Sequence, residues 1–144
     1  MTSSPTWFYW ALCSAVFAAL TAIFAKIGLQ GVNSDFATLI RTCVILVVLA
    51  AFVAFTGTWS NPLALSPKTW TFLVLSAFAT GASWVCYFRA LKIGDASKVA
   101  PVDKLSVILV AIIAVIFLGE RPSTREWCGI ALVSAGVFVL GFKR

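Results

Sequence analysis

Five long apolar segments alternate with short polar breaks along the chain. They cover residues 7–29, 35–56, 68–91, 97–118 and 126–142. About 20 apolar residues are enough for a helix to cross a bilayer. The pattern therefore predicts an all-α polytopic membrane protein with five transmembrane helices, forming one domain over residues 1–144.

The breaks between these segments carry residues that are typical of turns and helix ends. Gly31–Ser34 and Gly94-Asp95 are predicted turns, and Ser66-Pro67 supplies an N-cap followed by a proline in the first helical turn. Ser123 and Glu126 have the spacing of a capping box. Residues 1–6 carry no charged side chain, so the first segment is interpreted as a membrane helix and not as a secretory signal.

The composition excludes several classes of protein. Of the 144 residues, 61% are hydrophobic and 11% charged, which fits neither a soluble domain nor a disordered chain. The net charge is +6, but the positive residues do not form a basic face, so no nucleic acid is expected as a partner. There is no His, and the four Cys lie in four different segments. We therefore expect no metal, no cofactor and no enzymatic activity.

The distribution of charge favours one orientation in the membrane. Because five spans put the termini on opposite sides, the loop charges divide into two groups. The N-terminal side carries three, at Lys68, Arg121 and Arg125, and the C-terminal side carries six, at Lys26, Arg89, Lys92, Lys98, Lys143 and Arg144. The positive-inside rule then predicts a cytoplasmic C-terminus in a multi-pass protein of the inner membrane.

Five charged residues lie within or close to the predicted spans, although a charge at the centre of a membrane helix costs roughly 2.5–3.5 kcal/mol. All five fall at a similar depth on the C-terminal side, and together they form one layer with a net positive charge. Lys26 and Arg89 lie near helix ends, where they could snorkel to headgroups. For Arg41 and Asp103 the alternatives are a structural ion pair and a water-filled cavity with a substrate or ion role. The five residues are Lys26, Arg41, Arg89, Asp103 and Lys104.

Three further residues near this layer are candidates for the same cavity. Pro101 follows the start of its helix by one turn, where it is either tolerated or loosens the helix beside Asp103. Trp84 and Tyr87 lie close to Arg89 along the third segment. These aromatic side chains could stack on a substrate, hold an arginine by cation–π contact, or pack between helices.

The chain resembles the EamA domain of the drug/metabolite transporter superfamily. The resemblance rests on three motifs, which are Gly94–Ser97 with Ala100-Pro101-Val102, Leu118-Gly119-Glu120-Arg121, and a last helix with Gly129 and Gly136. Typical members have ten helices in two five-helix repeats of opposite orientation, so the resemblance implies that this chain is one repeat. It is similar to the small five-helix bacterial and archaeal members. The segments that look characteristic of them hold all five charges of the layer.

From the resemblance and the charges together, we expect a transporter of a small anionic or zwitterionic metabolite that works as a dimer by alternating access. Its partners would be the lipid bilayer, a small-molecule substrate, and a second copy or an inverted homologous chain. Asp103 is the candidate for proton coupling or for an ion pair, and Pro101 for a helix break. The predicted substrate-binding residues are Arg41, Lys26, Lys104, Trp84, Tyr87 and Arg89.

Two alternatives remain open. One is a proton-coupled exporter of cationic compounds, like the small multidrug exporters. Those proteins use a Glu in their first helix, whereas the membrane part of the first helix here holds Lys26 alone. The other is a membrane subunit that assists a partner without transporting.

Overall fold

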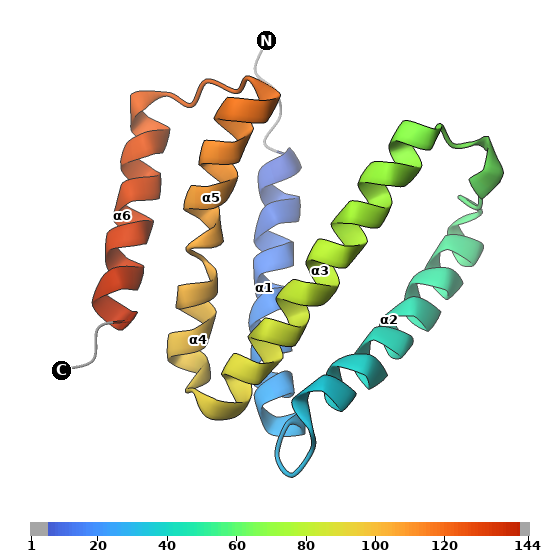
Figure 1. The fold of residues 1–144 in the computed structure, drawn as a ribbon, viewed down its shortest axis with the longest axis horizontal. Coiled ribbons are helices and arrows are strands. Elements are labelled where there is room, and N and C mark those ends of the chain that lie inside the picture. The colour runs from blue at the N-terminus through green and yellow to red at the C-terminus, as the bar shows by residue number, and fades with distance from the viewer. Residues whose placement is uncertain (1–5, 142–144) are drawn as a thin grey trace. The chain divides into compact units, whose positions relative to one another are not determined.

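The computed structural model describes residues 6–141, and every regular element in that range is helical (Figure 1). The predicted end of the last helix at residue 142 and the charges of Lys143 and Arg144 lie outside the described residues. The elements are α1 (Thr6–Gly28), α2 (Ser34–Thr56), the 3-10 helix η1 (Pro62–Ala64), α3 (Pro67–Ile93), α4 (Ala96–Asp103), α5 (Ser106–Ile113), the π-helix η2 (Ala114–Leu118) and α6 (Thr124–Gly141).

The chain divides into two compact units, Met1–Ile93 and Gly94–Arg144. In the first unit, α3 packs against both α1 and α2. The helices α2 and α3 are antiparallel and are joined by the connection that contains η1 (Figure 1). The buried apolar side chains of this unit lie where α1 ends and α3 ends. They are Ala22, Leu29, Phe88 and Leu91.

Local hydrogen bonds explain where the helices of the first unit begin and end. The Asn33 side chain accepts hydrogen bonds from the backbone N–H groups of Asp35 and Phe36, at 2.9 and 3.2 Å, and caps α2. Gly57, at φ 66°, ends α2 in the left-handed conformation that favours glycine. Ser66 Oγ accepts from the N–H of Thr69 at 3.1 Å and caps α3, which confirms the predicted N-cap.

The second unit contains an interrupted helix. α4 stops at Asp103 and α5 begins at Ser106, so the predicted helix over 97–118 is broken at Lys104 and Leu105. The backbone N–H groups of Lys104, Leu105, Val107 and Ile108 each donate to the carbonyl three residues back, which is the tighter winding of a 3-10 helix. Pro101 lies inside α4 and has no N–H to donate.

The other end of the interrupted helix is wound more loosely than an α-helix. Ala114–Leu118 forms a π-helix that ends at Gly119, at φ 68°. α6 then packs against α4 and α5. Its start is the predicted capping box. Glu126 Oε2 accepts from Ser123 N–H at 2.6 Å, and Ser123 Oγ accepts from Glu126 N–H at 3.4 Å.

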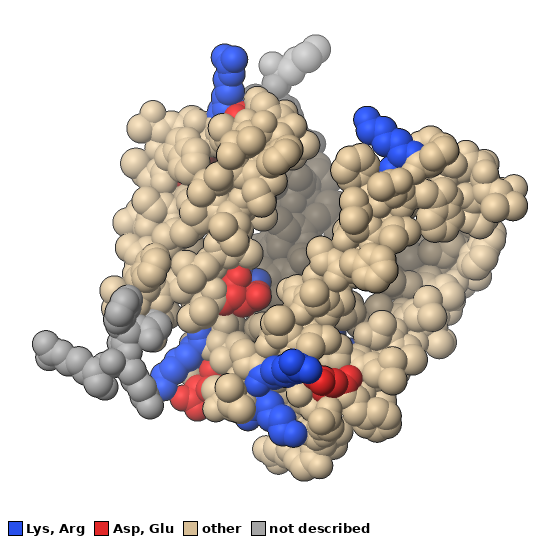
Figure 2. All heavy atoms as spheres, in the orientation of Figure 1, with Lys and Arg blue, Asp and Glu red and all other residues tan. Residues whose placement is uncertain are grey.

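The apolar surface of the helices is largely exposed. Phe55 is 93% exposed and Phe117 is 79% exposed, and in Figure 2 the charged atoms gather mainly toward the helix ends while uncharged residues cover the rest of the visible face. Soluble monomers rarely expose such apolar surface. By length and composition, four helices of the described range can cross a membrane, namely Thr6–Gly28, Ser34–Thr56, Pro67–Ile93 and the composite Ala96–Leu118.

The fifth predicted span corresponds to α6, which has 18 residues and is not among these four. Arg125 and Glu126 occupy its first turn, and the described part of the chain ends at Gly141. A fifth span therefore stays a prediction.

Candidate substrate site on α2 and α3

Arg41 lies two turns into α2, against two aromatic rings of α3. Its guanidinium carbon is 4.4 Å from the centroid of the Trp84 ring and 5.1 Å from that of Phe88. Trp84 and Phe88 are four residues apart, and therefore on one face of α3. Aromatic faces attract an arginine by cation–π interaction, and the attraction is stronger where water is excluded.

One nitrogen of this guanidinium has no oxygen partner. Arg41 Nη1 is buried and has no hydrogen-bond partner among the residues that the structure describes. Leaving a buried donor without an acceptor costs about 1–3 kcal/mol, and more for a charged group. A buried cationic donor of this kind attracts an anionic oxygen.

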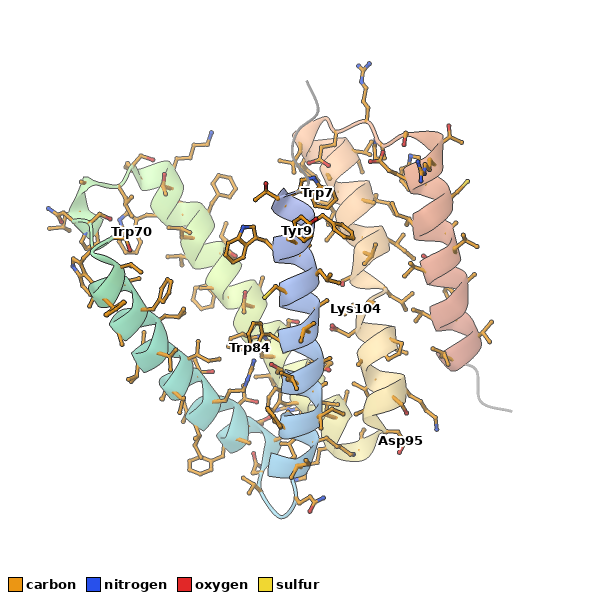
Figure 3. The ribbon with its side chains drawn as sticks, turned by 180° about the vertical axis from the view of Figure 1, so that it is seen from behind. Trp7, Tyr9, Trp70, Trp84, Asp95 and Lys104 are labelled. Carbon is orange, nitrogen blue, oxygen red and sulfur yellow. The ribbon has the colours of Figure 1, made fainter. Side chains whose placement is uncertain are left out.

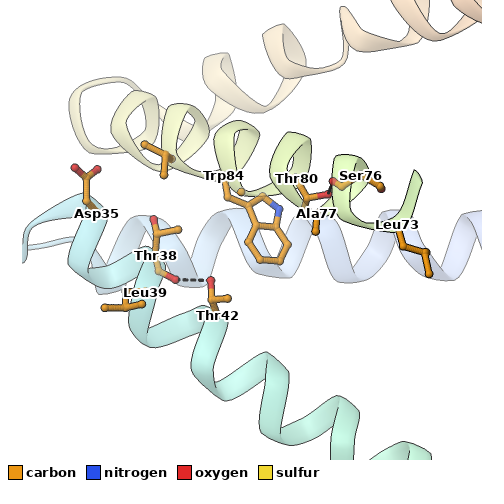
Figure 4. A pocket seen from close by; sticks show the side chains of 11 residues that line it. Asp35, Thr38, Leu39, Thr42, Leu73, Ser76, Ala77, Thr80 and Trp84 are labelled. Carbon is orange, nitrogen blue, oxygen red and sulfur yellow. Dashed lines mark hydrogen bonds between the residues drawn. The ribbon is translucent and has the colours of Figure 1, made fainter. Parts of the chain in front are cut away.

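A pocket of about 670 Å³ lies between α2 and α3. Trp84 belongs to its wall and also contacts Arg41. Figure 4 shows the Trp84 ring extending from α3 toward α2, across from Thr38 and Thr42. The α2 wall consists of Asp35, Thr38, Leu39 and Thr42, and the α3 wall consists of Leu73, Ser76, Ala77, Thr80, Gly81, Trp84 and Val85.

Most hydroxyl groups of the pocket are bonded to the backbone of their own helix. Thr38 Oγ1 donates to the Ser34 carbonyl at 2.8 Å, and Thr42 Oγ1 donates to the Thr38 carbonyl at 2.8 Å (Figure 4). Thr80 Oγ1 donates to the Ser76 carbonyl at 2.9 Å. Hydroxyls bonded in this way have no free O–H proton to donate to a ligand, and the wall of the pocket is largely apolar.

Asp35 at the pocket wall binds Arg89 in a bidentate ion pair. Arg89 Nε donates to Oδ1 at 2.9 Å, and Nη2 donates to Oδ2 at 2.7 Å. Asp35 is not part of the predicted charged layer, because it lies at the predicted start of a helix. The signal was present, since the start of α2 and the end of α3 must lie at the same end of two antiparallel neighbouring helices.

Two lysines hold the same end of the first unit together. Lys26 Nζ donates to the Leu91 carbonyl at 2.7 Å, and Lys92 Nζ donates to the Val32 carbonyl at 2.7 Å. A cation at the carbonyl end of a helix interacts favourably with the helix dipole. Lys26 therefore joins the end of α1 to the end of α3, and its predicted contact with substrate stays a prediction.

Three predicted site residues lie in the second unit. Lys104 is at the break between α4 and α5 (Figure 3), and its Nζ is 3.6 Å from Asp103 Oδ2. Pro101 is inside α4, three residues before the break. The proposed pairing of Arg41 with Asp103 would join the two units and stays a prediction.

Tyr87 is in the first unit, half-buried on α3, and its ring lies edge-on to Phe88 with centroids 6.3 Å apart. Within residues 6–141, no group of three His, Cys, Asp or Glu side chains could hold a metal ion.

The sequence matches the EamA-like transporter family over residues 5–142. It is 59% identical over 137 residues to the "uncharacterized transporter in cobO 3'region" of a Sinorhizobium species, covering 95% of this chain and 97% of that protein. It is also 24% identical over 136 residues to the uncharacterized transporter YxxF of Bacillus subtilis (strain 168), covering 94% of this chain and 42% of that protein.

No solved structure matches the chain. Two relatives named as transporters and a family match over nearly the whole sequence agree with the apolar helices described above. The chain is a membrane protein that belongs to the EamA-like transporter family.

Proposed function

We propose that this transporter carries a small anionic or zwitterionic metabolite and that Arg41 binds its carboxylate or phosphate group. The observation that supports this role is the buried Nη1 atom, which has no hydrogen-bond partner among the described residues. The other basic residues near this end of the first unit, Lys26, Arg89 and Lys92, each donate to an oxygen of the protein. Arg41 is therefore the cation best placed to gain from an external anion.

The remaining site residues have supporting roles in this proposal. Trp84 and Tyr87 shape the surroundings of Arg41, and Lys26, Arg89 and Lys104 add positive potential. Asp103 beside the helix break carries the coupling proton or balances Arg41 when no substrate is bound. Discontinuous helices in transporters often place such groups near a substrate.

The working unit in this proposal is a dimer that transports by alternating access in the inner membrane. The chain matches only 42% of the length of the Bacillus relative, which is consistent with one chain supplying half of a transport path. Two copies, or one copy and an inverted homologous chain, would then supply a whole one. We further propose that α6 completes a fifth span and that the C-terminus is cytoplasmic.

An uptake assay in proteoliposomes tests the substrate charge. We would measure uptake of radiolabelled glycine, pyruvate and inorganic phosphate, together with the fluorescent cation ethidium. At least one of the first three should accumulate, Arg41→Gln should abolish that uptake, and Lys68→Gln at the start of α3 should leave it unchanged. Uptake of ethidium alone, independent of Arg41, would instead identify an exporter of cations.

Topology reporters test the orientation and the fifth span. One reporter of each kind, active inside or outside, would be fused in turn after Arg121 and after Arg144. We expect the Arg144 fusion to be active inside and the Arg121 fusion outside. Activity of both reporters at each site would indicate dual topology and an antiparallel homodimer, whereas the same side for both sites would contradict a span at α6.

A further inference from the structure

We propose that the pocket between α2 and α3 receives the apolar, uncharged body of the substrate, and that the substrate is a monoanion with a single charged group directed to Arg41. This inference rests on the proposed function and adds a substrate class to it. It predicts selection for a hydrophobic monocarboxylate over both cations and strongly hydrophilic anions.

The two features of the pocket that would attract a cation are already occupied by arginines of this chain. An aromatic face and a carboxylate are the usual partners of a cationic ligand. Here the Trp84 ring lies against the Arg41 guanidinium, and the Asp35 carboxylate is held at both oxygens by Arg89. A cationic ligand would have to displace one of these arginines or approach it closely.

The pocket wall offers little to a hydrophilic body. Three of its four hydroxyls, on Thr38, Thr42 and Thr80, donate to the backbone of their own helix. The rest of the wall is mostly apolar and includes Leu39, Leu73 and Val85. A sugar or a second phosphate would lose its hydration shell there with little replacement, which is unfavourable.

A single anionic group fits the cations near the pocket. Arg41 Nη1 is a buried donor without a partner, whereas Arg89 already binds a carboxylate. Trp84 connects the pocket with Arg41, because its ring forms part of the pocket wall and lies against the Arg41 guanidinium. Arg41 is not among the residues that line the pocket, so a bound substrate reaches it only if the Trp84 ring moves aside.

Gly81 allows the pocket to be filled by mutation. It belongs to the pocket wall, and a Cβ atom added there meets nothing within 4 Å. A leucine at this position therefore lies at the pocket wall and meets no clash at its Cβ atom. Gly129 in α6 is a matched control, because it is also a helical glycine whose added Cβ meets nothing within 4 Å.

The test measures equilibrium binding to the purified full chain, using five small probes. Hexanoate has an apolar body and one charge, hexanol and hexylammonium keep the body with no charge or a positive charge, and acetate and inorganic phosphate are anions without the body. We expect hexanoate to bind at least tenfold more tightly than each of the others. Gly81→Leu should weaken hexanoate binding at least tenfold while leaving acetate unchanged, and Gly129→Leu should change neither.

The outcomes separate this inference from the function on which it rests. If acetate and phosphate bind through Arg41 but Gly81→Leu leaves hexanoate binding intact, the pocket proposal is wrong and the anion transporter stands. If Arg41→Gln changes the binding of no anion, the proposed function itself fails. Preference for hexylammonium over hexanoate would overturn the pocket proposal.

A hydrophobic monocarboxylate can reach the pocket either from water or from the bilayer. Hexanoate binding would be repeated in nanodiscs with and without oleate in the lipid phase. Competition by oleate would identify a lipid-derived carboxylate as a source. Unchanged hexanoate binding would identify a water-soluble one.

Discussion

The Arg89 guanidinium donates hydrogen bonds of 2.9 and 2.7 Å to the two oxygens of the Asp35 carboxylate. This pair joins the first turn of α2 to the last turns of α3. Because Asp35 also belongs to the pocket wall, the same bond fixes the separation of the two helices beside the pocket.

Breaking this pair should lower thermal stability. We expect a lower unfolding temperature in detergent for Asp35→Asn and for Arg89→Gln, and the double mutant Asp35→Arg with Arg89→Asp should recover part of the loss. Both side chains are substantially exposed, so the effect should shrink as salt is added. Equal stability of the single mutants and the wild type would show that the pair contributes nothing.

The contact between Arg41 and Trp84 should be measurable as a coupling energy. A cation–π contact contributes roughly 0.5–2 kcal/mol, depending on how far it is desolvated. We expect a double-mutant cycle of Arg41→Gln and Trp84→Leu, measured by unfolding in detergent, to give about 1 kcal/mol of coupling. The cycle with Trp70→Leu, near the start of α3, should be additive.

Lys26 should stabilise the first unit independently of any substrate. Its Nζ donates to the Leu91 carbonyl at 2.7 Å, and Lys26→Met removes that donor. We expect the free energy of unfolding to fall by about 1 kcal/mol. Lys68→Met, at the other end of α3, is the control and should change it little. A Lys26→Met protein as stable as the wild type but inactive would instead favour direct contact with substrate.

Replacing Pro101 should strengthen the interrupted helix. Pro101→Ala restores an N–H that can donate to the carbonyl four residues back, and it removes the clash of the proline ring. We expect slower amide hydrogen exchange at residues 101–105 and reduced transport if the break is used in the cycle. Pro67→Ala, at the first position of α3, should leave exchange unchanged, because proline is well tolerated there.

The helix ends could be predicted because they depend on neighbouring residues. Ser66 caps the helix that follows it, and Ser123 and Glu126 form the expected reciprocal bonds. A capping residue and the N–H groups that it binds are close in sequence, so their pattern is visible without tertiary structure.

The partners of the charged residues could not be predicted in the same way. The sequence places Arg41 and Arg89 at similar depths, but only the packing of α2 against α3 directs Arg41 to Trp84 and Arg89 to Asp35. The exact position of the break between α4 and α5 could not be predicted from the sequence either. A proline marks a weak point in a helix, but the tight turn forms at Lys104 and Leu105, where the hydrogen-bond pattern changes.

The two irregular ends of α5 have a consequence for any helical-wheel projection of residues 97–118. The backbone is overwound across the start of α5, at residues 104–108, and underwound after its end, at Ala114–Leu118. A residue in a 3-10 turn advances by about 120° where an α-helical residue advances by about 100°, and a π-turn advances by less. Ser106–Ile113 is therefore rotated about the helix axis relative to α4. A wheel drawn at constant pitch would assign its residues to the wrong face.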